Sequence, residues 1–324
     1  MLVSCQDDFL DLDPQDSITE AAYFKTPAHF QAAANDFYNK MISWRPINSS
    51  NIFDFMDFGS DLNSLVQPYG RGVITVPNTD VYYTNAYKYI RANNILIAKA
   101  GTYSGNPAEI SKYVAEAKFF RAWHHFFLLK RYGGVPIVTT VVDFNSPELY
   151  AARNSRYQVM VQLLKDLSEA IPDLPVEQSI GSSDKGHISR WAAEAFKARV
   201  LLYEATWERY VGNSTDGDGA GVGAGSAGAG SNVETYLQEA ITLARDVMDN
   251  GGYELWNYNS TLNNKSMFYL FNLEDSNSNP AGLDKTSNKE FILASKYDYN
   301  LYQGGTNLSP VSYTHLRAHE TDSY

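Results

Sequence analysis

EAKFFRAWHHFFLLKRYGGVP, residues 116–136, places four phenylalanines, one tryptophan and two adjacent histidines on what is predicted to be a single helix. Apolar side chains surround most of this helix, and only a narrow stripe formed by Lys118, Arg121 and His125 is polar. A helix with so wide an apolar surface needs neighbours on both sides. The stretch therefore predicts a helix sandwiched between two others, which ends at the glycine pair before the proline.

The adjacent His124 and His125 cannot grip one metal ion together, because neighbouring residues on a helix point about 100° apart. No HExxH or HxxxH spacing surrounds them. We therefore expect both imidazoles to fill space in the core. Glu116 precedes His124 by two turns on the same face, which leaves a buried ionic contact between them open, in a structural role.

Apolar residues recur at helical spacing in several other parts of the chain. With their caps and stops, these patterns predict helices at residues 27–42, 81–99, 107–132, 155–171, 189–210 and 236–248. Residues 135–142 are short, apolar and β-branched, and are expected to form either a strand or an extended strut. The predicted fold is all-α (mainly helical), with stacked helix hairpins, long aromatic-rich loops and minor short strands.

The composition narrows the range of partners. The chain has 324 residues and a formal charge of −11, without a Lys/Arg cluster, which argues against nucleic acid and anionic lipid surfaces. No apolar run reaches the roughly 18 residues that a membrane-spanning helix needs. Aromatic surface is plentiful, because the chain carries 23 tyrosines and 5 tryptophans.

Motif searches find no catalytic site, metal site or cofactor site. The Gly/Ser/Ala-rich residues 212–232 predict a flexible insertion between helices, and they lack the GK[ST] of a phosphate-binding loop. His315 and His319 have metal-ligand spacing, but the surrounding SYTHLRAHET resembles translated adapter sequence, so residues 312–324 are expected to be a non-native tail. No GxSxG motif occurs, and no pair of carboxylates stands out.

The N-terminal LVSC, residues 2–5, resembles a bacterial lipobox, and Cys5 is the single cysteine of the chain. The basic and apolar regions that precede a lipobox are missing, so either the chain begins internally or the match is accidental. Asp7 and Asp8 resemble the signal that exports lipoproteins to the outer face of the outer membrane in Bacteroides-like bacteria. We expect lipidation at Cys5 and a tether over residues 1–16.

Four segments together resemble the SusD/RagB family of outer-membrane nutrient-binding lipoproteins. They are the lipobox followed by DDFLDLDP (7–14), YKYIRANNIL (87–96), EAKFFRAWHHFFLLKRYGGVPIV (116–138) and ISRWAAEAFKARVLLYEA (188–205). The third is the most specific, because an EA-x-FxRA helix running into YGGVP is close to a family signature. Family members are longer, so residues 17–311 are expected to form a SusD-like helical domain with a truncated C-terminal part.

The resemblance implies tetratricopeptide-like helix pairs and no catalytic activity or cofactor. It implies capture of an oligosaccharide, or in some members a peptide, and delivery to a SusC-like TonB-dependent transporter at the cell surface. Sugar rings stack on aromatic side chains, while Asp and Asn hydrogen-bond their hydroxyls. The candidate ligand contacts are Asp61, Tyr82, Tyr83, Trp44 and Tyr69.

Two other functions stay open. Stacked hairpins also serve as helical-repeat scaffolds that bind other proteins, although a cytoplasmic scaffold would have no use for a lipidated Cys5. The third reading is a surface glycoside hydrolase, which release of reducing sugar would reveal.

Overall fold

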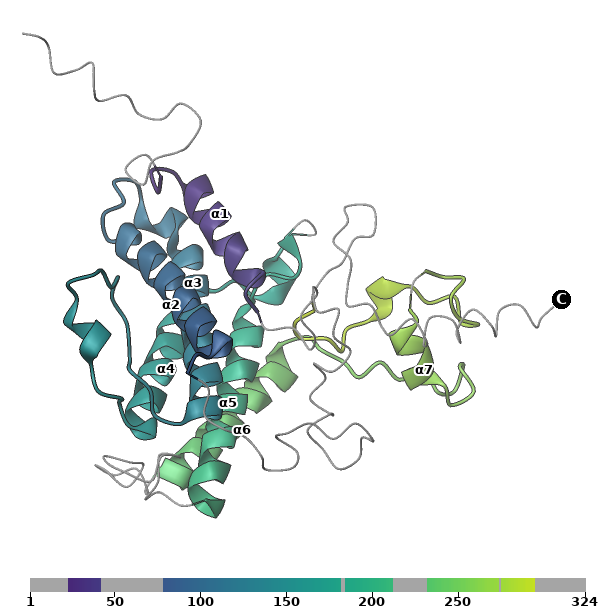
Figure 1. The fold of residues 1–324 in the computed structure, drawn as a ribbon. Coiled ribbons are helices and arrows are strands. Elements are labelled where there is room, and N and C mark those ends of the chain that lie inside the picture. The colour runs from purple at the N-terminus through teal and green to yellow at the C-terminus, as the bar shows by residue number, and fades with distance from the viewer. Residues whose placement is uncertain (1–22, 42–77, 182–183, 212–231, 274, 295–324) are drawn as a thin grey trace, which may run out of the picture. The chain divides into compact units, whose positions relative to one another are not determined.

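The structure is a computed structural model, and it describes residues 23–41, 78–181, 184–211, 232–273 and 275–294. In these ranges the chain is helical and contains no β-strand. The α-helices are α1 (Pro27–Tyr38), α2 (Val81–Ala100), α3 (Ser111–Tyr132), α4 (Arg156–Ala170), α5 (Arg190–Tyr210), α6 (Asn232–Asn250) and α7 (Ser266–Phe271) (Figure 1). Short 3-10 turns are η4 (Pro107–Glu109), η5 (Pro147–Tyr150), η6 (Ile171–Asp173), η7 (Glu177–Ser179) and η10 (Lys285–Ser287).

The chain divides into two compact units. The first comprises Met1–Phe37 and Tyr83–Ala294, and the second comprises Tyr38–Tyr82 and Ser295–Tyr324. The first unit holds α3 to α7 and most of α1 and α2.

Helices α3 and α4 form an antiparallel pair. Lys118 Nζ lies 2.8 Å from Glu169 Oε2, and Arg121, one turn further along α3, meets Asp166, one turn earlier on α4. Because the contact moves toward the C-terminus on α3 and toward the N-terminus on α4, the two helices run in opposite directions. The polar stripe predicted on α3 is therefore the face that meets the acidic side of α4.

Helices α5 and α6 repeat this arrangement (Figure 1). Lys197 Nζ lies 2.6 Å from Glu239 Oε1, and Arg190 lies 3.6 Å from Asp246. Two antiparallel pairs in succession are the stacked helix hairpins that the sequence predicted. The all-α fold with tetratricopeptide-like pairs is thus confirmed for the described residues.

Aromatic rings join the two pairs. Phe196 of α5 contacts Phe119, Trp123 and Phe126 of α3, with ring centroids 5.3, 4.8 and 5.7 Å apart. Thirteen of the 22 residues of α3 are buried, because α3 packs on α4 along one face and on α5 along another. This confirms that the aromatic density of the stretch belongs to a helix enclosed by neighbours.

The glycine pair that ends α3 has two distinct roles. Gly133 adopts a positive φ of 73°, and its N–H donates to Leu129 O at 3.0 Å, which closes the helix. Gly134 lies so close to the backbone of Asn154 that a Cβ there would collide with the Asn154 carbonyl oxygen. The chain can thus return past the start of α4 only because neither position carries a side chain.

Residues 135–140, called the strap here, are extended but join no sheet. Of the two alternatives predicted for this segment, the extended strut is the one that forms. A strand needs a partner strand, and none exists in the described part of the chain. Side chains from α2, from α3 and from the loop before α4 bind the strap instead.

The region after α6 is irregular, as predicted, but it contains the short helix α7 and a separate small core. The buried members of this core are Trp256, Leu262, Leu270 and Leu273. The sequence did not predict α7, because six residues are too few to show a helical period.

Several predicted segments lie outside the described residues, namely the 1–16 tether, nearly all of the 212–232 insertion and the 312–324 tail. Among the described helices, none combines the length and the apolar character needed to cross a membrane.

Candidate functional site

Two of the predicted ligand contacts, Tyr82 and Tyr83, lie at the start of α2. Tyr82 is 42% exposed, and its N–H donates to the Asp80 carboxylate at 2.8 Å. Consecutive residues on a helix point in different directions, so the two rings do not share a face. Trp44, Asp61 and Tyr69, together with the lipidation candidate Cys5, lie outside the described residues.

Tyr83 is held by neighbouring rings. Its ring centroid lies 4.8 Å from that of Tyr87 and 5.3 Å from that of Tyr132, the latter edge-on. The Tyr87 hydroxyl donates to Pro136 O at 2.7 Å, and burial, the charge of Tyr83 and a hydrogen bond with Tyr83 raise the pKa of Tyr87 above its usual value. Tyr83 therefore serves the packing at the end of α3, whereas Tyr82 is the more accessible ring.

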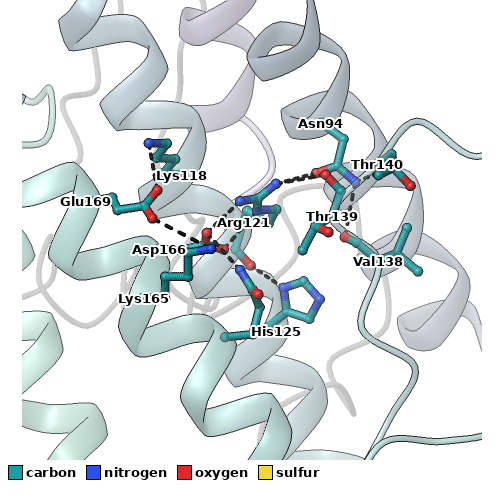
Figure 2. Close-up of polar contacts among 11 residues, drawn as sticks. Asn94, Lys118, Arg121, His125, Val138, Thr139, Thr140, Lys165, Asp166 and Glu169 are labelled. Atoms are coloured by element: carbon teal, nitrogen blue, oxygen red, sulfur yellow. Dashed lines mark hydrogen bonds and ion pairs between the residues drawn. The ribbon is translucent and has the colours of Figure 1, made fainter.

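The most extensive polar arrangement in the described chain centres on Arg121 (Figure 2). Its Nε and NH2 groups donate to the two carboxylate oxygens of Asp166 at 2.8 and 2.5 Å. Its NH1 group donates to Asn94 Oδ1 at 2.9 Å and to Thr139 O at 3.2 Å. Arg121 is only 6% exposed and Asp166 is fully buried, so this is a buried ion pair with its hydrogen bonds largely satisfied.

Asn94 extends this network to the strap (Figure 2). Its Nδ2 group donates to Val138 O at 3.1 Å and to Thr140 O at 2.8 Å. At the other end of the strap, Ile137 N–H donates to Asn154 Oδ1 at 2.9 Å. The side chains of α2 and α3 thus supply the hydrogen bonds that a neighbouring strand would otherwise give.

Sequence reasoning missed this network. In the sequence, Asn94 appeared only within the segment YKYIRANNIL, and Arg121 only as part of a polar stripe. The signal that could have found them is a polar side chain inside an apolar helical face, followed by a β-branched segment with no second strand to pair with.

The two histidines are core residues, as predicted. His124 is 1% exposed and packs on the Tyr89 ring with centroids 5.2 Å apart. His125 is fully buried, and its Nδ1 lies 2.9 Å from Arg121 O. Burial lowers the pKa of His124 to about 3, and that of His125 to about 4, so both imidazoles are neutral at physiological pH.

The ionic contact left open between Glu116 and His124 does not form. Glu116 instead lies 3.2 Å from His187 Nδ1, contributed by the segment before α5. The hydrogen bond with Glu116 raises the pKa of His187 above its usual value. His187 lies 71 positions away along the chain, and nothing in the helical pattern of α3 points to it.

A second buried ion pair lies where α4 meets α5. Arg156 Nε lies 2.9 Å from both carboxylate oxygens of Glu204, and its NH2 group donates to Glu204 Oε2 at 2.6 Å. The guanidinium also lies 4.1 Å from the centroid of the Trp207 ring. Among the described residues, no group of three His, Cys, Asp or Glu side chains is placed to hold a metal ion.

Comparison with known proteins gives a family match and a set of distant relatives. The family described as "Starch-binding associating with outer membrane" matches residues 8–202. A SusD-like protein of Bacteroides ovatus is 25% identical over 269 residues, which cover 79% of this chain and 43% of that protein. SusD-like protein P2 of Formosa agariphila is 22% identical over 226 residues, covering 64% of this chain and 42% of that protein.

Solved structures share the fold. A SusD-like carbohydrate binding protein from Bacteroides fragilis superposes with a TM-score of 0.59 at 20% identity, over 86% of this chain and 47% of that one. A protein described as a laminarin binding SusD-like protein gives a TM-score of 0.54 at 22% identity, over 74% of this chain and 49% of that one. The chain thus spans somewhat less than half the length of the relatives that it matches.

Proposed function

The chain belongs to the SusD-like family, and from that membership we propose that it captures oligosaccharides at the cell surface, without catalysis, and passes them to a SusC-like TonB-dependent transporter. The observation that carries this proposal is the family match over residues 8–202, which covers more than half of the chain and ends within α5. The helix pairs α3/α4 and α5/α6 would then act as a rigid support and take no part in chemistry.

Carbohydrate is the favoured ligand class for two reasons. The family description names starch, and one structural relative is described as binding laminarin. Within this chain, Tyr82 offers an exposed ring at a helix start, where a sugar face can stack. We further propose that Asp61, Trp44 and Tyr69 complete the contacts and that Cys5 carries the lipid anchor.

Affinity electrophoresis and calorimetry with soluble starch and laminarin test the ligand class. We expect at least one of these glucans to bind, and Tyr82→Ala to weaken that binding about tenfold, which corresponds to roughly 1.4 kcal/mol of lost stacking. Tyr150→Ala is the matched control, because Tyr150 is an exposed tyrosine on another segment. This variant should bind the glucan with the same affinity as the unaltered chain.

A reducing-sugar assay on the same protein tests the absence of catalysis, and measurable turnover would establish a hydrolase instead. Binding to neither glucan, nor to a wider panel of polysaccharides, would contradict the carbohydrate assignment. If Tyr82→Ala and Tyr150→Ala weaken glucan binding equally, the ligand class is still supported, but Tyr82 is not a specific ligand contact.

A further inference from the structure

Three helices meet at a buried group of ionisable side chains that the proposed binding function does not use. Arg156 begins α4, Glu204 and Glu208 lie one turn apart on α5, and Tyr236 lies near the start of α6. None of the four is more than 7% exposed. Two carboxylates therefore share this enclosed corner with a single guanidinium.

The guanidinium is directed at Glu204. Arg156 binds both oxygens of that carboxylate, and its NH1 group lies 3.4 Å from Leu129 O on α3. Glu208 Oε2, in contrast, is buried and has no hydrogen-bond partner within the described residues. An ionised carboxylate in that position would leave one negative charge uncompensated in a place that excludes water.

The groups that face the corner come from every helix packed around it. They are Arg156 and Tyr157 of α4, Glu204 and Glu208 of α5, and Tyr236 and Glu239 of α6. Lys197 of α5 neutralises Glu239 at 2.6 Å. Burial, reinforced by the charge of Glu204 and opposed by that of Arg156, raises the pKa of Glu208 to about 7.

Helix α6 buries few of its own side chains. Its buried residues are Tyr236, Ala240 and Val247, whereas the neighbouring α5 buries twelve of its 21 residues. The first of the three is Tyr236, whose pKa is raised above the usual value by burial and by the nearby charges of Glu208 and Glu204. A change of charge at Glu208 therefore acts on one of the three buried side chains of α6.

We propose that this corner is a proton-dependent latch for α6, in which Glu208 holds a proton while α6 is docked and releases it when α6 separates and water reaches the carboxylate. Proton release then favours the undocked state. Between the ordinary pKa of 4.5 and about pH 7, the ratio of undocked to docked α6 rises with pH by at most about tenfold per pH unit, the limit for one linked proton, and above about pH 7 it levels off.

Hydrogen exchange of the full chain, corrected for the intrinsic pH dependence of the exchange rate, measures this ratio at α6. Between about pH 5 and pH 7, we expect protection of α6 to fall severalfold as the pH rises in the unaltered chain and to stay constant in Glu208→Gln, which keeps the shape of the protonated side chain. Glu234→Gln, an exposed carboxylate on α6, is the matched control and should behave as the unaltered chain. The same fall in Glu208→Gln as in the unaltered chain would overturn the latch.

Infrared spectroscopy gives a second readout that does not depend on the stability of the variant. The carbonyl band of a protonated carboxylic acid should be present in the unaltered chain and in Glu234→Gln at about pH 6, and should disappear as the pH rises through about 7. It should be absent from Glu208→Gln. If the unaltered chain lacks this band at pH 6, Glu208 is ionised in the docked state and the proposal fails.

Discussion

At the scale of the single residue, Arg121 decides how a charged side chain is accommodated inside an apolar helix. Its five N–H donors form a planar fork, and that geometry lets one side chain bind Asp166 on α4, Asn94 on α2 and the strap together. Lysine in the same place would offer a single ammonium with no fork. The polar stripe read from the sequence is therefore the meeting point of three elements.

Removal of Asp166 should expose the cost of this arrangement. In Asp166→Ala the guanidinium stays buried without its carboxylate, and we expect the free energy of unfolding to fall by about 3–5 kcal/mol. Denaturant unfolding measures the change. The double variant Arg121→Met with Asp166→Leu removes both charges and should recover most of the loss. A cost below about 1 kcal/mol for Asp166→Ala would show that water reaches the pair.

His124 should make stability sensitive to acid. Its folded-state pKa of about 3 lies below the ordinary 6.5, so the unfolded chain binds more protons between these values and stability falls as the pH drops from 6.5. Glu208 acts with the opposite sign from its ordinary pKa of 4.5 up to about 7, because there the folded chain holds the extra proton.

The two effects are separated in the Glu208→Gln background. There, unfolding free energies measured from about pH 6.5 to pH 4.5 should decline less steeply when His124→Leu is added, by up to about 1.4 kcal/mol per pH unit. Parallel curves with and without His124→Leu would mean that the buried imidazole already carries its proton.

At the scale of the element, the turn after α3 explains the YGGVP motif. Gly133 provides the left-handed cap, and Gly134 permits the approach to Asn154, whose side chain then binds the strap. The two adjacent glycines are therefore required for different reasons, one for its backbone conformation and the other for the lack of space. The motif is thus the point at which helix, strap and the start of α4 are fixed to one another.

Gly134→Ala should reveal the close approach. The added Cβ would collide with the Asn154 carbonyl oxygen, and we expect a loss of about 1–3 kcal/mol in unfolding free energy, measured by thermal or denaturant melts. Gly181→Ala is the matched control, since a Cβ there meets nothing within 4 Å, and it should be neutral or slightly stabilising. Similar effects at both sites would exclude the collision as the cause.

The elements themselves were largely predictable. Caps, stops and helical spacing located α1 to α6 within a few residues, because long amphipathic helices leave a periodic signal in the sequence. The strap left two alternatives open, because its fate depends on side chains that are distant in sequence, such as Asn94 against Val138, 44 positions away. Helix α7 left no signal, and the pairing of Glu116 with His187 could not be read from one helix alone.

At the scale of the whole chain, the described residues contain two separate kinds of core. The helix pairs share a continuous aromatic interior, while Trp256, Leu262, Leu270 and Leu273 form their own cluster after α6.

The candidate ligand site was less predictable from the sequence than the fold. Three of its five residues lie outside the described ranges, so only Tyr82 and Tyr83 could be located, and they take unequal positions.

Trp256→Ala should loosen one core and spare the other. The indole is 4% exposed, and its N–H donates to Ser287 Oγ at 3.0 Å, so truncation leaves a cavity and removes this hydrogen bond. We expect faster hydrogen exchange across α7 and residues 256–273, with protection in α3 and α5 unchanged. Equal loss of protection in α3 would show that the two cores unfold as one cooperative unit.

The strap has a consequence for solubility. VPIVTT is the kind of β-branched sequence that pairs with a copy of itself when its edge is open. Here, Asn94, Arg121, Tyr87 and the Asn154 backbone already bind five of its carbonyl oxygens, so these oxygens are taken before another chain could pair with them. The polar groups that brace the strap thus also reduce its capacity to pair with a second copy of itself.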